Sequence, residues 1–197
     1  MIILDIESSG LNSGRCGIWQ IGAVEFENPE NTFLEESRID DEDETTKEAL
    51  MITGKTEDEL RNKNKQSQKQ MIEHFLDWCK ICKERVVAGH NVGWDISFIQ
   101  NKCIRYGIQN KFHDVIGVRV IDLHTIASLK YREKNGVFKL KDGVGKSDMS
   151  LPNVMEFCGL KDNRRIIEKG KLVKEGEPHN ALTDAKLTAE CFRRLLK

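Results

Sequence analysis

Short segments rich in apolar and β-branched residues alternate with segments of helical periodicity along this chain. Three strand-like segments come first, at residues 1–6, 18–26 and 32–39, and two follow at 85–89 and 118–123. The expected helices cover residues 45–52, 67–84, 95–106, 150–158 and 181–196. Three successive strands predict an antiparallel meander. Because strands and helices alternate after it, we expect an α/β fold in which helices flank a mixed β-sheet.

The length and charge of the chain limit its organisation and partners. Its 197 residues contain no linker-like segment, so we expect a single domain over residues 1–197. Lysine and arginine number 31 against 32 aspartates and glutamates, a formal net charge of −1. This balance excludes a general polyanion binder but allows a local basic face. The sequence shows no secretory signal and no apolar stretch of about 18–20 residues. We therefore expect a cytoplasmic protein without a membrane partner.

The cysteines and one acidic run favour structural roles. The six cysteines are scattered, and reduced thiols are expected in the cytoplasm. Cys79 and Cys82 form a C-x2-C pair, but a zinc site needs two more ligands and no second pair exists. Two thiols on one helical turn are therefore favoured over zinc. The run at residues 40–44 is continuous, so its side chains diverge, which favours a solvated loop over a metal site.

Two acidic residues close the first predicted strand. Asp5 and Glu7 are two positions apart, so on a strand they point to the same side. Adjacent carboxylates repel each other unless a cation lies between them. A strand end that leads into a glycine-containing loop is a common position for a site in an α/β sheet. For this pair alone, a solvent-exposed strand end remains the alternative.

Two further acids lie at the starts of predicted helices. Asp95 belongs to the segment AGHNVGWDISF at residues 88–98, where helix N-capping is its alternative role. Asp184 belongs to HNALTDA at residues 179–185 and lies near the buried side of the last helix. A buried carboxylate needs a partner or a metal. His179 begins the same segment and, taken alone, would more often be a surface or packing residue.

Together these segments supply four carboxylates and one imidazole. Hard oxygen ligands of this kind suit Mg²⁺ or Mn²⁺. Two such ions can activate a water and stabilise the leaving oxygen at a phosphodiester. An imidazole, with an ordinary pKa of about 6.5, can accept the proton of that water. The constellation therefore predicts metal-dependent phosphodiester hydrolysis.

The same segments resemble the motifs of a known family. LDIESSGL, at residues 4–11, resembles the first motif of the DnaQ-like exonucleases of the DEDD superfamily, which has a ribonuclease H-like fold. HNVGWDISFI, at residues 90–99, is similar to the second motif, commonly written H-N-x-x-F-D-x-x-F-L. HNALTDA resembles the third motif of the branch with a catalytic histidine. The three motifs span residues 4–185 in the family's order.

The resemblance implies a 3′→5′ exonuclease that uses two Mg²⁺ or Mn²⁺ ions and releases nucleoside 5′-monophosphates from single-stranded or frayed nucleic-acid 3′ ends. Its metal-binding acids would be Asp5, Glu7, Asp95 and Asp184. By the same resemblance, Asp5 bridges both ions, Glu7 and Asp184 hold the ion that carries the attacking water, and Asp95 completes the site. His179 matches the general base.

The resemblance also implies a pocket for the last nucleotide. The matching positions are Ser8, Ser9, Gly10, Leu11, Asn91, Trp94 and Phe98. Backbone groups of the first loop would contact the 3′ end, and Leu11 would wedge against its base. Trp94 departs from the usual phenylalanine but is still an apolar ring.

Two segments, 130–149 and 161–177, look longer than the family core and are rich in basic residues. The first cluster contains Lys130, Arg132, Lys134, Lys139, Lys141 and Lys146. The second contains Arg164, Arg165, Lys169, Lys171 and Lys174. Each could be a solvated flexible loop, but next to a nuclease site it could track the phosphate backbone. For the first cluster, contact with the phosphate backbone is the favoured interpretation.

Two alternatives differ from this prediction in chemistry. The first is a nucleic-acid-binding or interaction module of the same fold without catalysis, and the second is a ribonuclease H-type endonuclease, which would not need His179. The sequence leaves the choice between DNA and RNA open. It also leaves open a homodimer or a polymerase-type partner.

Overall fold

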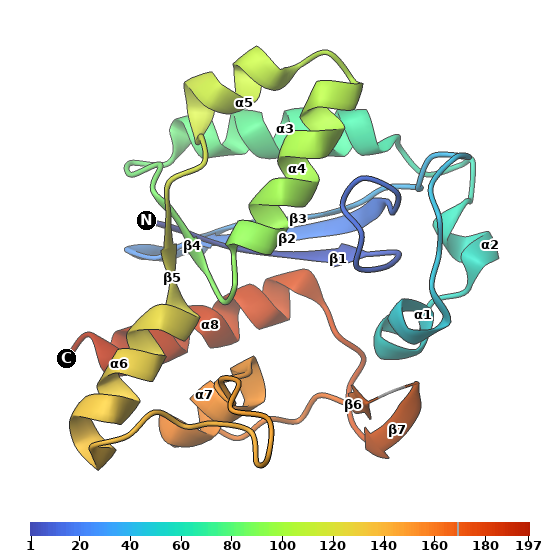
Figure 1. Ribbon diagram of the computed structural model, residues 1–197. Helices are drawn as coiled ribbons and strands as arrows, with labels where there is room; N and C mark the ends of the chain where they lie inside the picture. Colours follow the sequence, from blue (N-terminus) through green and yellow to red (C-terminus); the bar gives the residue numbers. More distant parts are fainter. Residues whose placement is uncertain (169) are drawn as a thin grey trace.

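The computed structural model describes residues 1–168 and 170–197, and a mixed five-stranded sheet lies at its centre (Figure 1). The strand order is β3-β2-β1-β4-β5. The strands are β1 (Ile2–Ser8), β2 (Ile18–Glu25), β3 (Asn28–Glu36), β4 (Val87–Gly89) and β5 (Val120–Asp122). The first three strands pair antiparallel, whereas β4 pairs parallel with β1 and β5 parallel with β4. The predicted mixed sheet with an opening meander is confirmed.

Helices cover both faces of this sheet (Figure 1). One face carries α3 (Gln68–Ile81), α4 (Gly93–Arg105) and α5 (Gln109–Val115), and the other carries α6 (Leu123–Asn135), α7 (Leu151–Phe157) and α8 (Ala181–Leu195). The short elements are α1 (Lys47–Thr53), α2 (Glu57–Leu60) and a hairpin of β6 (Ile166–Glu168) and β7 (Lys171–Lys174). The hairpin packs against α1 through β6. Among the described residues, no helix combines the length and apolar character of a membrane span.

The side chains of β1 alternate between two hydrophobic cores. Ile2, Leu4 and Ile6 pack in the core that contains residues of α3 and α4. Ile3 packs in the second core, with residues of α6, α7 and α8. Since side chains two positions apart share a face of a strand, Asp5 and Glu7 lie on the α8 side. The alternation of the first strand therefore directs its acids toward the last helix.

Several boundaries differ from the expected ones. The third strand covers Asn28–Glu36 rather than residues 32–39, because a tight turn at residues 26–27 pairs Glu25 with Asn28. Its polar, exposed first half gave no apolar signal. The sequence prediction also missed α2, α5, α6 and the β6–β7 hairpin. Helix α6 has weak periodicity because its buried residues are only Leu123 and Ala127.

The interpretation of the acidic run 40–44 as a solvated loop is wrong for Asp43. Its carboxylate is fully buried and lies 2.5 Å from the buried Lys102 ammonium of α4. Gln68 donates to the same carboxylate at 2.7 Å. Burial acts to raise the pKa of Asp43, but hydrogen bonding to Lys102 and its charge hold that pKa below the usual value. A buried ion pair therefore fixes the loop that leads into α1.

The C-x2-C pair lies within and just after α3. Cys79 and Cys82 are buried free thiols, and burial raises the pKa of Cys82 to about 11. Neither belongs to the group of metal-ligating side chains found in the part of the chain that the structure describes. Protonated, buried thiols on a helix fit the packing role that the sequence favoured.

Helix α8 approaches the sheet closely at Gly22 of β2. A Cβ atom at this position would lie 2.1 Å from the backbone nitrogen of Leu182 and 2.2 Å from the carbonyl carbon of Ala181. Gln20, on the same strand, accepts a hydrogen bond from the Ala181 N–H at 2.8 Å. The missing side chain of Gly22 therefore sets how near the start of α8 comes to the acids of β1.

Replacing Gly22 by alanine is expected to push α8 away from the sheet. Because the clash is with backbone, we expect a loss of about 3 kcal/mol in the free energy of unfolding, measured in urea. Gly14→Ala is the matched control, because its Cβ would meet only the Asn12 side-chain oxygen at 3.4 Å. Equal stability of the two variants would contradict this account of the α8 position.

Candidate active site

The first strand contributes two of the acids, Asp5 and Glu7. Glu7 is only 7 % exposed, and its Oε1 atom is buried without a hydrogen-bond partner. Asp5 is half-buried on the same side of the strand. A buried carboxylate oxygen without a donor is costly. This pair therefore calls for a cation or another charged group.

Helix α8 brings the third acid to this pair. Asn180 caps the helix by accepting a hydrogen bond from the Thr183 N–H at 3.1 Å, so that Asp184 falls in the first helical turn. Asp184 is 3 % exposed, and its Oδ1 atom is also buried without a partner. Its Oδ2 atom accepts a hydrogen bond from Nη1 of Arg164 at 2.9 Å.

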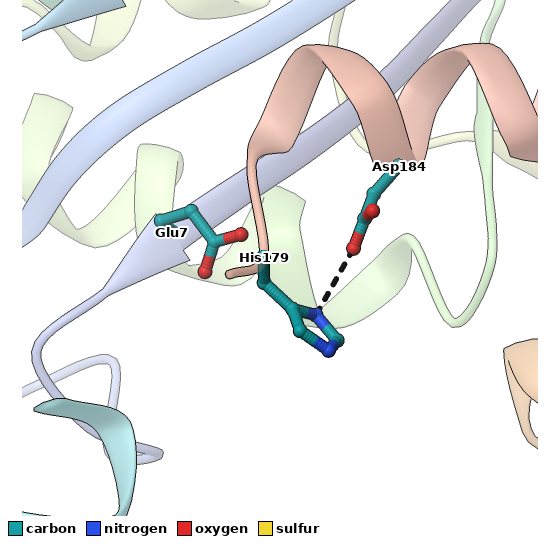
Figure 2. Close-up of side chains that lie close together, drawn as sticks. All are labelled: Glu7, His179 and Asp184. Carbon is teal, nitrogen blue, oxygen red and sulfur yellow. Dashed lines mark ion pairs between the residues drawn. The ribbon is translucent and has the colours of Figure 1, made fainter. Parts of the chain in front are cut away.

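The imidazole of His179 lies between the acids and a neighbouring backbone segment. Its Nδ1 atom is 3.1 Å from Oδ2 of Asp184, with Glu7 beside the pair (Figure 2). Its Nε2 atom is 3.1 Å from the carbonyl oxygen of Arg165. Both ring nitrogens therefore face oxygen atoms, which fixes the plane of the ring.

Asp95 reaches the site from the other side of the sheet. It lies in the first turn of α4 and is 4 % exposed. The N-cap alternative is wrong, because Val92 occupies the cap position and no side chain bonds there. Instead, Oδ1 of Asp95 accepts a hydrogen bond from the Ile6 N–H at 3.0 Å. This bond ties α4 to β1 between Asp5 and Glu7.

The four carboxylates interact strongly. Burial raises the pKa of Asp5 well above its ordinary value, and the charges of Asp184, Asp95 and Glu7 raise it further. The pKa of Glu7 is raised by burial and then by Asp184 and Asp95. Burial raises the pKa of Asp95 to about 8, although the Ile6 N–H bond opposes the shift. Without a cation, the site therefore resists full ionisation.

The donor set fits divalent cations. One ligand atom each from Glu7, His179 and Asp184 lies within 4.8 Å of the others. The unpartnered Oε1 of Glu7 and Oδ1 of Asp184 supply carboxylate oxygens, which Mg²⁺ and Mn²⁺ prefer. The structure thus brings three of the five motif side chains within ligand distance of one another, whereas Asp5 and Asp95 lie outside this group but belong to the same set of interacting carboxylates.

Two hollows adjoin the acids. A cavity of about 220 Å³ is lined by Ile6, Glu7, Ser8, Gly10, Leu11, Glu48, Ala49, Ile52, Thr53 and Trp94. A second, of about 520 Å³, is lined by Asp5, Ile6, Leu11, His90, Asn91, Trp94 and Asp95. Leu11 is 79 % exposed between them, and its carbonyl accepts a hydrogen bond from Nε1 of Trp94 at 3.3 Å. Sequence reasoning missed the wall formed by α1, which carries no motif.

Two residues that were expected in the pocket, Ser9 and Phe98, are buried behind the residues that line the hollows. Ser9 is fully buried and lines neither hollow. Its hydroxyl donates to the Glu44 carbonyl, and its own carbonyl accepts from the Thr46 N–H at 2.7 Å. Phe98 is also fully buried, with its ring centre 4.5 Å from that of Trp94. Ser9 thus anchors the first loop to the segment before α1, and Phe98 supports Trp94.

The expectation of a basic loop is wrong for Arg164. This residue is 4 % exposed and pairs with Asp162 at 2.8 Å and with Asp184 at 2.9 Å. The run of basic residues around it concealed this role, because nothing in the local pattern distinguishes a buried arginine from solvated ones. Lys169, from the same expected cluster, lies outside the described residues.

Comparison with known proteins assigns this arrangement to a family. The RNase_T family, described as exonucleases, matches residues 2–192. The chain belongs to the RNase_T exonuclease family. The predicted relationship to the DnaQ-like exonucleases is therefore confirmed.

Curated relatives of this exonuclease-family chain include polymerases. It is 24% identical over 196 residues to the PolC-type DNA polymerase III of Caldanaerobacter subterraneus subsp. tengcongensis. It is 25% identical over 204 residues to the PolC-type enzyme of Thermotoga maritima. The matches cover 100% of this chain but only 11% and 12% of those relatives. The chain thus spans about an eighth or less of their length.

Solved structures share the fold of the exonuclease-family chain. E. coli exonuclease I in complex with a dT13 oligonucleotide matches with a TM-score of 0.73 at 17% identity, covering 100% of this chain and 40% of that one. A 3′-exonuclease that recognises the histone mRNA stem-loop matches with a TM-score of 0.66 at 18% identity, covering 99% and 62%. The sheet and its flanking helices are those of the ribonuclease H-like DEDD exonuclease fold.

Proposed function

We propose that the chain is a metal-dependent 3′→5′ exonuclease that hydrolyses the terminal phosphodiester bond of a nucleic acid and releases nucleoside 5′-monophosphates. The observation that carries this proposal is the pair of buried carboxylate oxygens without donors, on Glu7 and Asp184. They lie within a group of four acids, and Glu7 also lines the 220 Å³ cavity. Family membership supports the reaction class.

Each side chain of the site would have a separate role in this reaction. Asp5, Glu7, Asp95 and Asp184 would hold two divalent cations. Bound there, the ions would supply an activated water and stabilise the leaving oxygen. His179 would accept the proton of that water, once its Nδ1 atom is no longer directed at Asp184. Leu11 and Trp94 would hold the terminal base, because both line the two hollows beside the acids.

The proposed substrate is a single-stranded or frayed 3′ end. The complex of E. coli exonuclease I with dT13 supports a single-stranded substrate. The matched 3′-exonuclease, which recognises the histone mRNA stem-loop, supports RNA as the alternative substrate. The PolC-type relatives support a polymerase-type partner as a further proposal.

The test is degradation of matched DNA and RNA oligomers of several lengths, labelled at the 3′ nucleotide, with Mn²⁺ or Mg²⁺. We expect metal-dependent release of labelled mononucleotide and none in EDTA. A circular single strand of the same sequence should stay intact, because an exonuclease needs an end. Cleavage of the circle would support the endonuclease alternative, and binding without metal-dependent release would support the inactive module.

We further propose that the first basic cluster contacts the strand behind its 3′ end. Half of it lies on α6 and half on the loop that follows, so the expectation of a loop alone is wrong. The loop returns to the site, where the carbonyl of Met149 lies 2.9 Å from Nε2 of His90. The side chain of Phe138 is 43 % exposed, and the guanidinium carbon of Arg132 lies 4.9 Å from the centre of its ring. Exposed aromatic rings among basic side chains suit the binding of single-stranded nucleic acid, because bases stack on the rings and the basic groups follow the phosphate backbone.

Replacing Lys139 and Lys141 together by glutamine is expected to weaken binding of single-stranded oligomers in Ca²⁺. The slope of log K against log salt concentration should become shallower by about 1.4, since each of the two phosphate contacts contributes about 0.7. Lys80→Gln with Lys83→Gln is the matched control, at the exposed end of α3. The same slope in both double variants would remove the cluster from the substrate path.

A further inference from the structure

One short segment contacts two of the five site residues. Arg164 donates to Oδ2 of Asp184 through its side chain, and the next residue, Arg165, presents its carbonyl oxygen to Nε2 of His179. The segment lies directly before the β6–β7 hairpin. The sequence left the basic residues of this segment open between a solvated loop and contact with substrate, yet the guanidinium of Arg164 is buried.

The segment is held rigidly. Arg165 donates its N–H to the Glu177 carbonyl at 2.9 Å, and the Glu177 N–H donates to the Asn163 carbonyl at 2.9 Å. At Gly176 a Cβ atom would lie 2.4 Å from the Asn163 carbonyl oxygen. The two ends of the hairpin insert thus pack backbone to backbone, so Arg164 projects from a fixed point.

Asp162 sets the orientation and the charge of Arg164. Its carboxylate accepts hydrogen bonds from the backbone N–H, Nε and Nη2 of Arg164 at 3.0, 2.9 and 2.8 Å. This paired fork is a stiff arrangement that a lysine cannot reproduce. The pair has no net charge, so it adds little repulsion toward a cation at the site. The remaining guanidinium nitrogen, Nη1, donates to Asp184.

We infer that Arg164, oriented by Asp162, is a positioning residue that holds Asp184 by Oδ2 so that Oδ1 faces the metal. This inference rests on the metal site of the proposed function. The contacts of Asp184 support it. Its Oδ2 accepts a hydrogen bond from Arg164 and lies 3.1 Å from Nδ1 of His179, whereas Oδ1 of Asp184 and Oε1 of Glu7 have no hydrogen-bond partner. Residues that orient metal ligands change metal affinity about tenfold to a hundredfold when replaced.

The test is Mn²⁺ binding by the full chain without nucleic acid, measured by calorimetry. Two variants separate the effect of the arginine geometry at position 164 from the effect of its charge. Arg164→Lys keeps the charge but loses the fork, and Asp162→Asn with Arg164→Gln removes the pair without changing the net charge. The control is Lys171→Gln with Glu175→Gln, which removes one exposed charge of each sign from the same insert. Cooperative thermal melting identifies variants that are folded, and one folded variant of the first two suffices.

A positioning role predicts that both variants bind Mn²⁺ about tenfold more weakly or worse, whereas the control stays within twofold. Restoration of tight binding when Arg164 is put back into the Arg164→Lys background verifies the protein preparation. Unchanged or tighter binding by a folded variant would overturn the inference, because Arg164 would then be a spectator or a competitor of the metal. Mn²⁺ binding without nucleotide release by the unmodified chain would overturn the proposed function alone, since the comparison of affinities needs no turnover.

Discussion

Replacing Asp5 by asparagine is expected to reduce nucleotide release by at least about a thousandfold, or about 4 kcal/mol in activation free energy, while making the metal-free protein more stable. Activity falls whereas stability rises, because the same carboxylate acts differently in the metal-bound and the metal-free protein. With metal bound, Asp5 would be one of the metal ligands. Without metal, burial and three neighbouring acids oppose its ionisation, so its charge costs folding free energy. The measurements are initial rates with Mn²⁺ and thermal melting in EDTA at pH 8.

The melting temperature in EDTA should rise by several degrees, since about 1 kcal/mol shifts a chain of this length by roughly 2–4 °C. Asp142→Asn is the control, because Asp142 lies exposed in the loop after α6. That control should change neither quantity. An Asp5→Asn variant that degrades oligomers at the normal rate would refute the proposed site, and one that melts earlier would refute the electrostatic strain.

Raising the pH is expected to destabilise the metal-free protein. The pKa of Asp95 is about 8 in the folded chain, against an ordinary value of 3.8. The folded chain therefore holds a proton that the unfolded chain releases, so this contribution is complete below pH 4 and is lost as the pH rises through 8. The loss is on the order of 5 kcal/mol for a shift of this size. Urea unfolding in EDTA between pH 5 and pH 9 measures it.

Adding Mn²⁺ should cancel much of this loss, because a cation binds the ionised carboxylates and stabilises the folded state by mass action. The Asp95→Asn variant should show a flatter dependence on pH in EDTA and a smaller gain from Mn²⁺. Metal-free protein that is as stable at pH 8 as at pH 5 would show that the acids ionise without strain.

The sequence predicted those parts of the molecule whose signals are local. Strand alternation gave the meander, and the same alternation placed Asp5 and Glu7 on one side of β1. Of the five side chains that the three motifs named, the structure brings Glu7, His179 and Asp184 together as candidate ligands and places Asp5 and Asp95 among the interacting acids. What local patterns could not give were contacts between distant segments. The pairing of Asp43 with Lys102 and of Arg164 with Asp184 each joins a charge to a partner far along the chain.

The missed elements have a related explanation. Helix α6 and the β6–β7 hairpin bury few side chains, so their sequences carry weak periodicity. Helix α1 was expected from its pattern, but its role as a pocket wall depends on where the ion-paired loop before it is anchored. Such placement follows from packing of the whole chain and cannot be seen in any one segment.

The position of α8 also has a consequence for how the chain matures. Its first N–H is bonded to Gln20, 161 positions earlier. Contacts of such long range form late in folding. Strand β1 can present Asp5 and Glu7 before α8 has docked on the sheet, but the acidic group lacks Asp184 until α8 is in place. The proposed hydrolysis would therefore require a docked α8, so a chain whose β-sheet has formed without this helix would hold an incomplete set of acids and stay inactive.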